Sequence, residues 1–179
     1  KITVDDLKNG KLRSTVFQHE HCNNLANFTS LHTRQLGMVT VKPTRAWLHV
    51  RNWDQLGAAW GAGSLTNVIA SVGPPSFTAG EWNGQCSAVP TQVLAGGTLT
   101  NTELVVSVPV GTYQFLPYVP FVTMIGWTCG TPQPVANGGG MHYYTSNPND
   151  ALMAAPAGMT RVDNQGFLDF YWEFEYAND

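Results

Sequence analysis

Residues 168–176 alternate between large apolar side chains and mostly acidic ones. Leu, Phe, Trp, Phe and Tyr occupy the even positions, and Asp169, Tyr171, Glu173 and Glu175 occupy the odd ones. Successive side chains of a strand point to opposite faces, so this period of two predicts a long strand with one face on a core. The other face is expected to meet solvent or a charged partner.

Several shorter runs are rich in β-branched and aromatic residues and are bounded by Gly, Pro or Asn, as strands are. They are residues 14–21, 38–41, 45–50, 65–71, 103–108, 121–129 and 141–145. Short helices are predicted at 52–60, capped by Asn52, and at 150–155, capped by Asp150. Asn83-Gly84 is the one tight-hairpin dipeptide, and it lacks good flanking strands, so we expect long connections. The pattern predicts an all-β fold, an eight-stranded antiparallel jelly-roll sandwich with long loops.

Length and composition limit the number of domains and the kind of compartment that we expect. At 179 residues the chain has the length of one domain. Its three cysteines are widely spaced, which is typical of free thiols in a reducing compartment. No run of eighteen apolar residues occurs, so we expect no membrane span. The chain begins with Lys1 rather than Met and shows no signal peptide, so we expect it to be processed or trimmed.

The charged residues are few and segregated. Residues 1–51 carry eight of the nine Lys and Arg against three carboxylates, and residues 52–179 carry one cation against nine carboxylates. Within residues 55–149 only Glu81 and Glu103 are charged. A long uncharged middle predicts a surface covered by protein, and a basic first third predicts contact with something anionic.

Two segments resemble a known family. Gly96-Gly97-Thr98-Leu99 leads into the apolar run 103–110, and the run 119–129 leads into Thr131-Pro132-Gln133-Pro134. Together with the closing strand 166–176, they resemble the second half of the coat (capsid) proteins of small icosahedral positive-strand RNA viruses, tymovirus-like ones most of all. The resemblance covers about half of the chain, roughly residues 92–179.

The resemblance implies a structural capsid subunit, not an enzyme and without a cofactor. Such a subunit self-assembles with identical copies into an icosahedral shell around viral genomic RNA, and it is found in the virion, assembled in the host cytoplasm. It implies an inward-facing basic segment at 1–13 and a shell domain at 14–179. Lys1, Lys8, Lys11 and Arg13 would then face RNA phosphates without sequence preference, although Asp5 and Asp6 interrupt these cations.

The tryptophans divide into two groups. Trp127 and Trp172 lie in apolar strand-like runs and are expected in the core, whereas Trp53, Trp60 and Trp82 lie in loop-like sequence. We interpret the second group as subunit contacts. The alternative is a carbohydrate-binding β-sandwich module in which these three rings stack on sugar.

His19 and His21 have the spacing of a metal chelate, because imidazoles two apart on a strand share a face. With His142 they resemble the ligand pattern of a cupin-like metal-binding β-barrel. However, no Glu stands three or four residues beyond His21, where that family has a ligand. We therefore interpret His19 and His21 as a subunit-interface pair and keep the metal site as the alternative.

The three acids of the closing strand invite comparison with paired catalytic carboxylates. Glycosidases place two acids across a cleft, usually on different strands. Asp169, Glu173 and Glu175 alternate on a single strand, so we interpret them as a solvated face.

Overall fold

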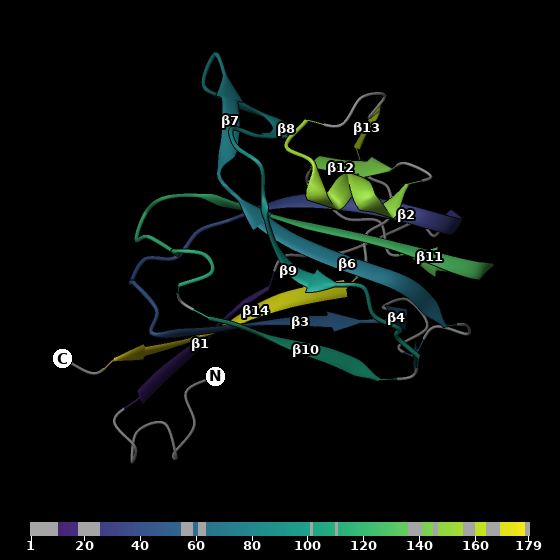
Figure 1. Ribbon diagram of the computed structural model, residues 1–179, viewed down its shortest axis with the longest axis horizontal. Helices are drawn as coiled ribbons and strands as arrows, with labels where there is room; N and C mark the ends of the chain where they lie inside the picture. The colour runs from purple at the N-terminus through teal and green to yellow at the C-terminus, as the bar shows by residue number, and fades with distance from the viewer. Residues whose placement is uncertain are drawn as a thin grey trace.

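The computed structural model describes residues 11–17, 26–54, 59–60, 64–100, 102–109, 111–135, 141–144, 147–155, 160–163 and 169–177. These residues form a sandwich of two four-stranded antiparallel sheets, seen as the lower and middle layers of Figure 1. Sheet A has the order β1 (Lys11–Phe17), β14 (Asp169–Ala177), β3 (Arg45–Arg51) and β10 (Glu103–Val108). Sheet B has the order β2 (Ala26–Gly37), β11 (Phe121–Val135), β6 (Leu65–Gly73) and β9 (Thr91–Ala95). The predicted all-β sandwich is confirmed.

The pairing of these eight strands is nested. The first pairs with the last (β1 with β14), the second with the seventh (β2 with β11), the third with the sixth (β3 with β10), and the fourth with the fifth (β6 with β9). Two further pairings, β14 with β3 and β11 with β6, join these pairs into the two sheets. The chain is therefore arranged as one long hairpin wrapped into two layers.

The core lies between the sheets and follows from the alternation along each strand. Phe170, Trp172 and Phe174 of sheet A are buried against residues such as Phe121 and Trp127 of sheet B. Both tryptophans predicted for the core, Trp127 and Trp172, have no exposed surface, which confirms that prediction. Phe115, from the connection before β11, packs edge-on against three of these rings at centroid distances of 5.0 to 5.1 Å.

Sheet B is also covered on its outer face. There the 3₁₀ helix η1 (Pro148–Leu152) and the hairpin β7 (Pro75–Thr78)–β8 (Glu81–Cys86) bury a second apolar cluster, which comprises Ile69, Trp82, Cys86, Val122, Met124 and Ala151. Helix η1 approaches so closely that an ideal Cβ on Gly126 would lie 2.8 Å from Cα of Pro148. Glycine is therefore required where η1 crosses β11.

Several local predictions are wrong. The helix expected at 52–60 is replaced by the paired strands β4 (Trp53–Asp54) and β5 (Ala59–Trp60). The strand expected at 38–41 is a single bridge between Val39 and Pro117. The helical turn near residue 150 exists, but Asn147 caps it by accepting a hydrogen bond from the Asn149 amide.

The β7–β8 hairpin was not predicted. Its two-residue turn is formed by Ala79 and Gly80, both with positive φ, rather than by Asn83-Gly84, which lies within β8. Such primed turns match the twist of the flanking strands. A further small sheet pairs β12 (Met141–Tyr144) with β13 (Thr160–Asp163). Within the described part of the chain, no helix has the length and hydrophobicity needed to cross a membrane.

Candidate functional site

The predicted RNA-facing and histidine residues fall in different places. Lys1, Lys8, His19 and His21 lie outside the described residues. Lys11 and Arg13 belong to β1, an edge strand of sheet A, where they stand opposite Ala177 and Glu175. Two of the four predicted RNA contacts are therefore part of the sheet.

The three tryptophans that were predicted as one group of contacts, Trp53, Trp60 and Trp82, lie in different elements of the structure. Trp53 and Trp60 stand directly opposite each other in β4 and β5. Trp82 is only 7% exposed, and its indole N–H donates to the carbonyl of Gln85 at 2.9 Å. The expectation that Trp82 meets a neighbour or a sugar is wrong, because the hairpin turns its ring into the second apolar cluster.

His142 lies on β12, opposite Val162, in the small sheet outside the two four-stranded sheets. Its proposed partners His19 and His21 are not described, so the metal-site alternative stays a prediction. Among the residues that are described, no three His, Cys, Asp or Glu side chains come together in a way that could hold a metal ion.

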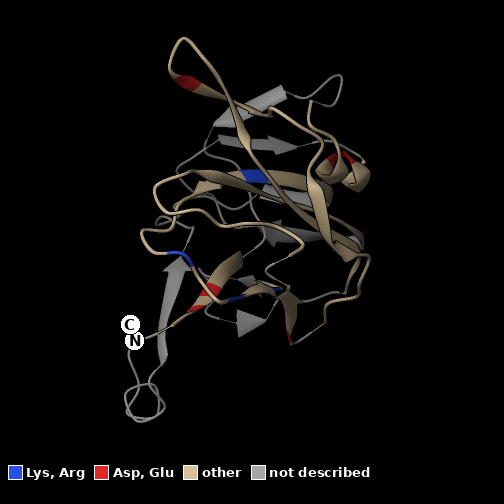
Figure 2. Ribbon diagram, turned by 60° about the vertical axis from the view of Figure 1, so that its left-hand side comes forward, with Lys and Arg blue, Asp and Glu red and all other residues tan. Residues whose placement is uncertain are grey.

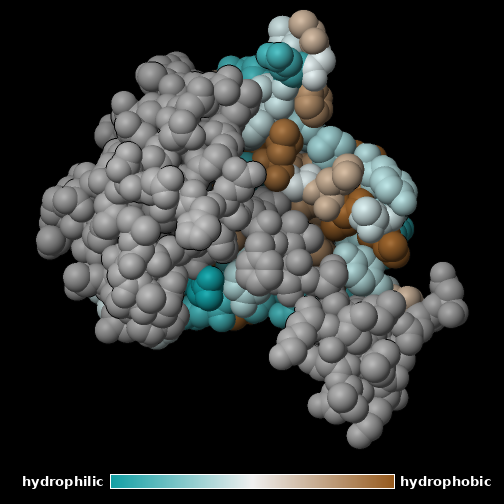
Figure 3. All heavy atoms as spheres, turned by 180° about the vertical axis from the view of Figure 1, so that it is seen from behind, coloured by the Kyte–Doolittle hydropathy of each residue, from teal (hydrophilic) through white to brown (hydrophobic). Residues whose placement is uncertain are grey.

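In the part of the chain that the structure describes, the main exposed apolar surface lies at one end of the sandwich. We call it the apolar end and define it by five side chains that are between 42% and 72% exposed: Met38, Val41, Leu116, Tyr118 and Val119. They come from two connections, 38–44 and 109–120, which run side by side at the left of Figure 1. Figure 3 shows hydrophobic residues gathered on this side of the molecule. Clustered exposure of this kind marks interaction surfaces.

The apolar end has a defined backbone. The amide of Tyr118 donates to the carbonyl of Val39 at 2.8 Å, which fastens one connection to the other. Val39 and Phe115 anchor the two connections in the core. Tyr118, the most exposed of the five, has φ of +59°, a conformation costly for a bulky residue. The fold therefore holds an aromatic ring outward at an energetic cost.

The apolar end carries almost no charge. Lys42 is the one charged residue of the connection 38–44, and residues 109–120 contain none. Figure 2, which brings this end toward the reader, shows these connections almost entirely uncharged. A partner that covers this surface would therefore have to accommodate the charge of Lys42 and otherwise meet uncharged residues.

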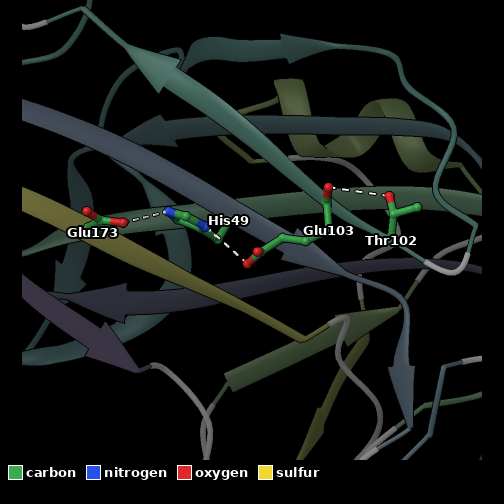
Figure 4. A network of polar contacts seen from close by, with 4 residues as sticks. All are labelled: His49, Thr102, Glu103 and Glu173. Atoms are coloured by element: carbon green, nitrogen blue, oxygen red, sulfur yellow. Dashed lines mark hydrogen bonds and ion pairs between the residues drawn. The ribbon is translucent and has the colours of Figure 1, made fainter. Parts of the chain in front are cut away.

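A polar cluster occupies the outer face of sheet A (Figure 4). His49 of β3 lies between two carboxylates: its Nδ1 is 3.0 Å from Oε1 of Glu103 in β10, and its Nε2 is 3.2 Å from Oε2 of Glu173 in β14. The Tyr171 ring stacks on the imidazole at 4.3 Å, and the Arg51 guanidinium lies 5.5 Å from the Tyr171 ring centre. The cluster ties three neighbouring strands together across the sheet.

This cluster changes the interpretation of the acidic face. Burial, followed by a hydrogen bond to Glu103, raises the pKa of Tyr171 far above its ordinary value, so the phenol stays protonated. Glu175 is only 3% exposed, and its Oε1 lies 3.7 Å from Nε of Arg45. The prediction of a solvated acidic face is therefore wrong at Glu175. His49 alternates with the buried Leu48 and Val50, so the sequence could have placed it on the outer face of sheet A. The sequence could not show that its charged partners come from strands that are distant along the chain.

The buried Arg34 holds η1 and the β7–β8 hairpin against the outer face of sheet B. Arg34 of β2 has no exposed surface and donates to four backbone carbonyls: those of Gly84, Asp150, Met153 and Ala154. Its Nε also donates to Nε2 of His32 at 3.2 Å. The guanidinium thus joins β2 to both β8 and the η1 region. These carbonyls satisfy the N–H donors of the buried guanidinium, so Arg34 fastens the cover to sheet B.

The chain matches no protein-family model, and no curated protein is significantly similar to it.

Proposed function

We propose that this chain is a structural capsid subunit, a single jelly roll that self-assembles with identical copies into an icosahedral shell around an RNA genome. In this role it acts in the virion and performs no catalysis. The nested pairing of the eight strands supports a jelly roll, a fold that viral capsid, lectin and cupin domains share. Because the fold serves several functions, the choice among them must come from surfaces.

The observation that carries the proposal is the apolar end. Five large apolar side chains stand exposed on two connections that are fastened to each other and contain a single charge, that of Lys42. Subunit interfaces have apolar cores poor in charge, with aromatic rings enriched. The strained backbone at Tyr118 supports a role for its exposed ring in recognition. A preordered surface of this kind loses little entropy on binding.

The RNA part of the proposal rests on charge. Four of the nine cations, Lys1, Lys8, Lys11 and Arg13, fall in the first 13 residues, which supports contact with phosphates there. Asp5 and Asp6 interrupt these cations and reduce the positive charge of the segment. We therefore expect weak, sequence-independent RNA binding.

Assembly is tested on the full chain by sedimentation velocity and electron microscopy, with and without RNA, from about pH 5 to about pH 8. We expect uniform closed particles. The paired variant Leu116→Ser/Val119→Ser should remain a folded monomer, whereas Val105→Thr, an exposed apolar position on β10, should assemble normally. A wild-type chain that stays monomeric under all of these conditions would overturn the proposal.

RNA binding is tested by measuring affinity for unrelated RNAs between about 50 and 200 mM salt. Affinity should fall with salt and depend little on sequence. Replacing Lys1, Lys8, Lys11 and Arg13 by Gln should reduce the slope of log affinity against log salt by about 0.7 for each phosphate that the variant no longer neutralises. An unchanged slope would remove these four residues from the proposal.

A further inference from the structure

The β7–β8 hairpin projects from the sandwich beyond η1 and ends in a run of exposed residues (Figure 1). We call residues 77–81 the hairpin tip. Phe77 is 49% exposed, and the four residues that follow it are all exposed. An exposed phenylalanine on a projecting turn is a candidate for insertion into a partner surface.

The hairpin tip has a defined turn geometry. Ala79 and Gly80 have φ of +52° and +85°, and they form a two-residue turn closed by the pairing of Thr78 with Glu81. The Asn83 side-chain amide donates to Oγ1 of Thr78 at 3.2 Å. Below the tip, the buried Trp82 fixes the hairpin to sheet B. The turn, the Asn83 hydrogen bond and the buried Trp82 therefore all support the tip.

The two surfaces carry single charges of opposite sign. Glu81 is the one charged residue of the hairpin tip, and Lys42 is the one charged residue of the connections that form the apolar end. Both side chains are exposed. Figure 1 places the two surfaces on different sides of the subunit, so one copy can offer its tip while its other side receives a neighbour.

We propose that the hairpin tip of one copy docks on the apolar end of the next, with Phe77 against the apolar side chains and Glu81 facing Lys42. This inference rests on the proposed self-assembly and names its contact. A contact between two different surfaces is heterologous, and it generates closed rings where the rotation between subunits allows closure. The alternative, in which two apolar ends meet face to face, would bring two Lys42 side chains together, and like charges disfavour such pairings.

The test exchanges the two charges. Lys42→Glu and Glu81→Lys should each raise the concentration needed for assembly about three- to tenfold, because each places like charges across the contact. The double variant restores opposite charges with the same net charge as wild type, so it should assemble within about twofold of wild type. Single effects that simply add in the double variant would overturn the inference.

A second pair of variants tests the apolar part of the contact. Phe77→Ser should weaken assembly at least as strongly as either charge reversal, whereas Val89→Ser should have no effect although Val89 is 79% exposed. Equal effects of the two variants would also overturn the inference. If wild type assembles and the charge exchange shows no rescue, the docking contact is wrong and the capsid proposal stands. If wild type does not assemble, the proposed function itself fails.

Discussion

The indole N–H of Trp172 in sheet A donates a 2.8 Å hydrogen bond to Oγ1 of Thr123 in sheet B, across the middle of the sandwich. Both residues are completely buried. A buried donor that loses its acceptor costs about 1 to 3 kcal/mol. We therefore expect Thr123→Val, which keeps the side-chain shape, to lower the free energy of unfolding by that amount in urea titrations. Thr66→Val, at an exposed hydroxyl, is the control and should change stability by less than about 0.5 kcal/mol.

Gly126 leaves no room for a side chain beneath η1. Gly126→Ala should destabilise the protein by about 1 to 3 kcal/mol, because the added methyl group meets the backbone of Pro148 rather than a flexible side chain. Thermal unfolding measures the change. Gly111→Ala is the matched control, since an ideal Cβ there has no neighbour within 4 Å. Equal melting temperatures for the two variants would mean that η1 does not pack against β11 in this way.

The burial of His32 predicts a loss of stability in mild acid. Burial, and then the nearby charge of Arg34, lower the pKa of His32 well below its ordinary value. Between that lowered pKa and about 6.5, the unfolded chain binds a proton that the folded chain does not, so stability falls as pH falls. The loss is at most about 1.4 kcal/mol per pH unit.

This prediction is measured by urea unfolding at a series of pH values for wild type and His32→Gln. The difference in unfolding free energy between the two proteins should shrink as pH falls below about 6.5. Because the other histidines are common to both proteins, their contributions cancel. Parallel pH profiles would show that His32 does not titrate in this way.

A substitution of Tyr118 should affect assembly without lowering the stability of the monomer. Tyr118→Gly should leave the monomer as stable as wild type or stabilise it by up to about 1 kcal/mol, because glycine adopts positive φ without strain. The same variant should lose particle formation if the exposed ring lies in a subunit contact. Asn67→Gly, another position with positive φ, is the control and should assemble normally. A Tyr118→Gly variant that forms wild-type particles would exclude the ring from the contact.

Strands of both sheets were predicted well, and the predictions 65–71 and 121–129 in sheet B correspond to β6 and to the first part of β11. The prediction 103–108 coincides with β10, 45–50 differs from β3 by one residue, and the alternating segment 168–176 contains nearly all of β14. Strand β2 was missed because its buried residues include His32, Thr33 and Arg34, so it has no continuous apolar run like those of β6 and β11. A strand with two buried faces has no period of two to detect.

The surfaces were harder to predict than the strands. Val39 is buried while Met38 and Val41 are exposed, a difference that depends on the bridge to Pro117, almost eighty positions away. The His49 cluster similarly needs Glu103 and Glu173 from separate strands. The β7–β8 turn was missed because alanine occupies a position where Asn or Asp usually signals a primed turn. Local sequence carries none of these relationships.

Strand β14 follows every other described strand in the chain, and it lies inside sheet A between β1 and β3. During synthesis β1 and β3 therefore cannot pair with β14 until that strand has been made, whereas β6 and β9 can pair earlier. Loop closure over most of the chain is slow, and incomplete folds expose unpaired strand edges. The last strand therefore sets when the sandwich can be completed, because a nascent chain can finish sheet A only after translation has passed residue 177.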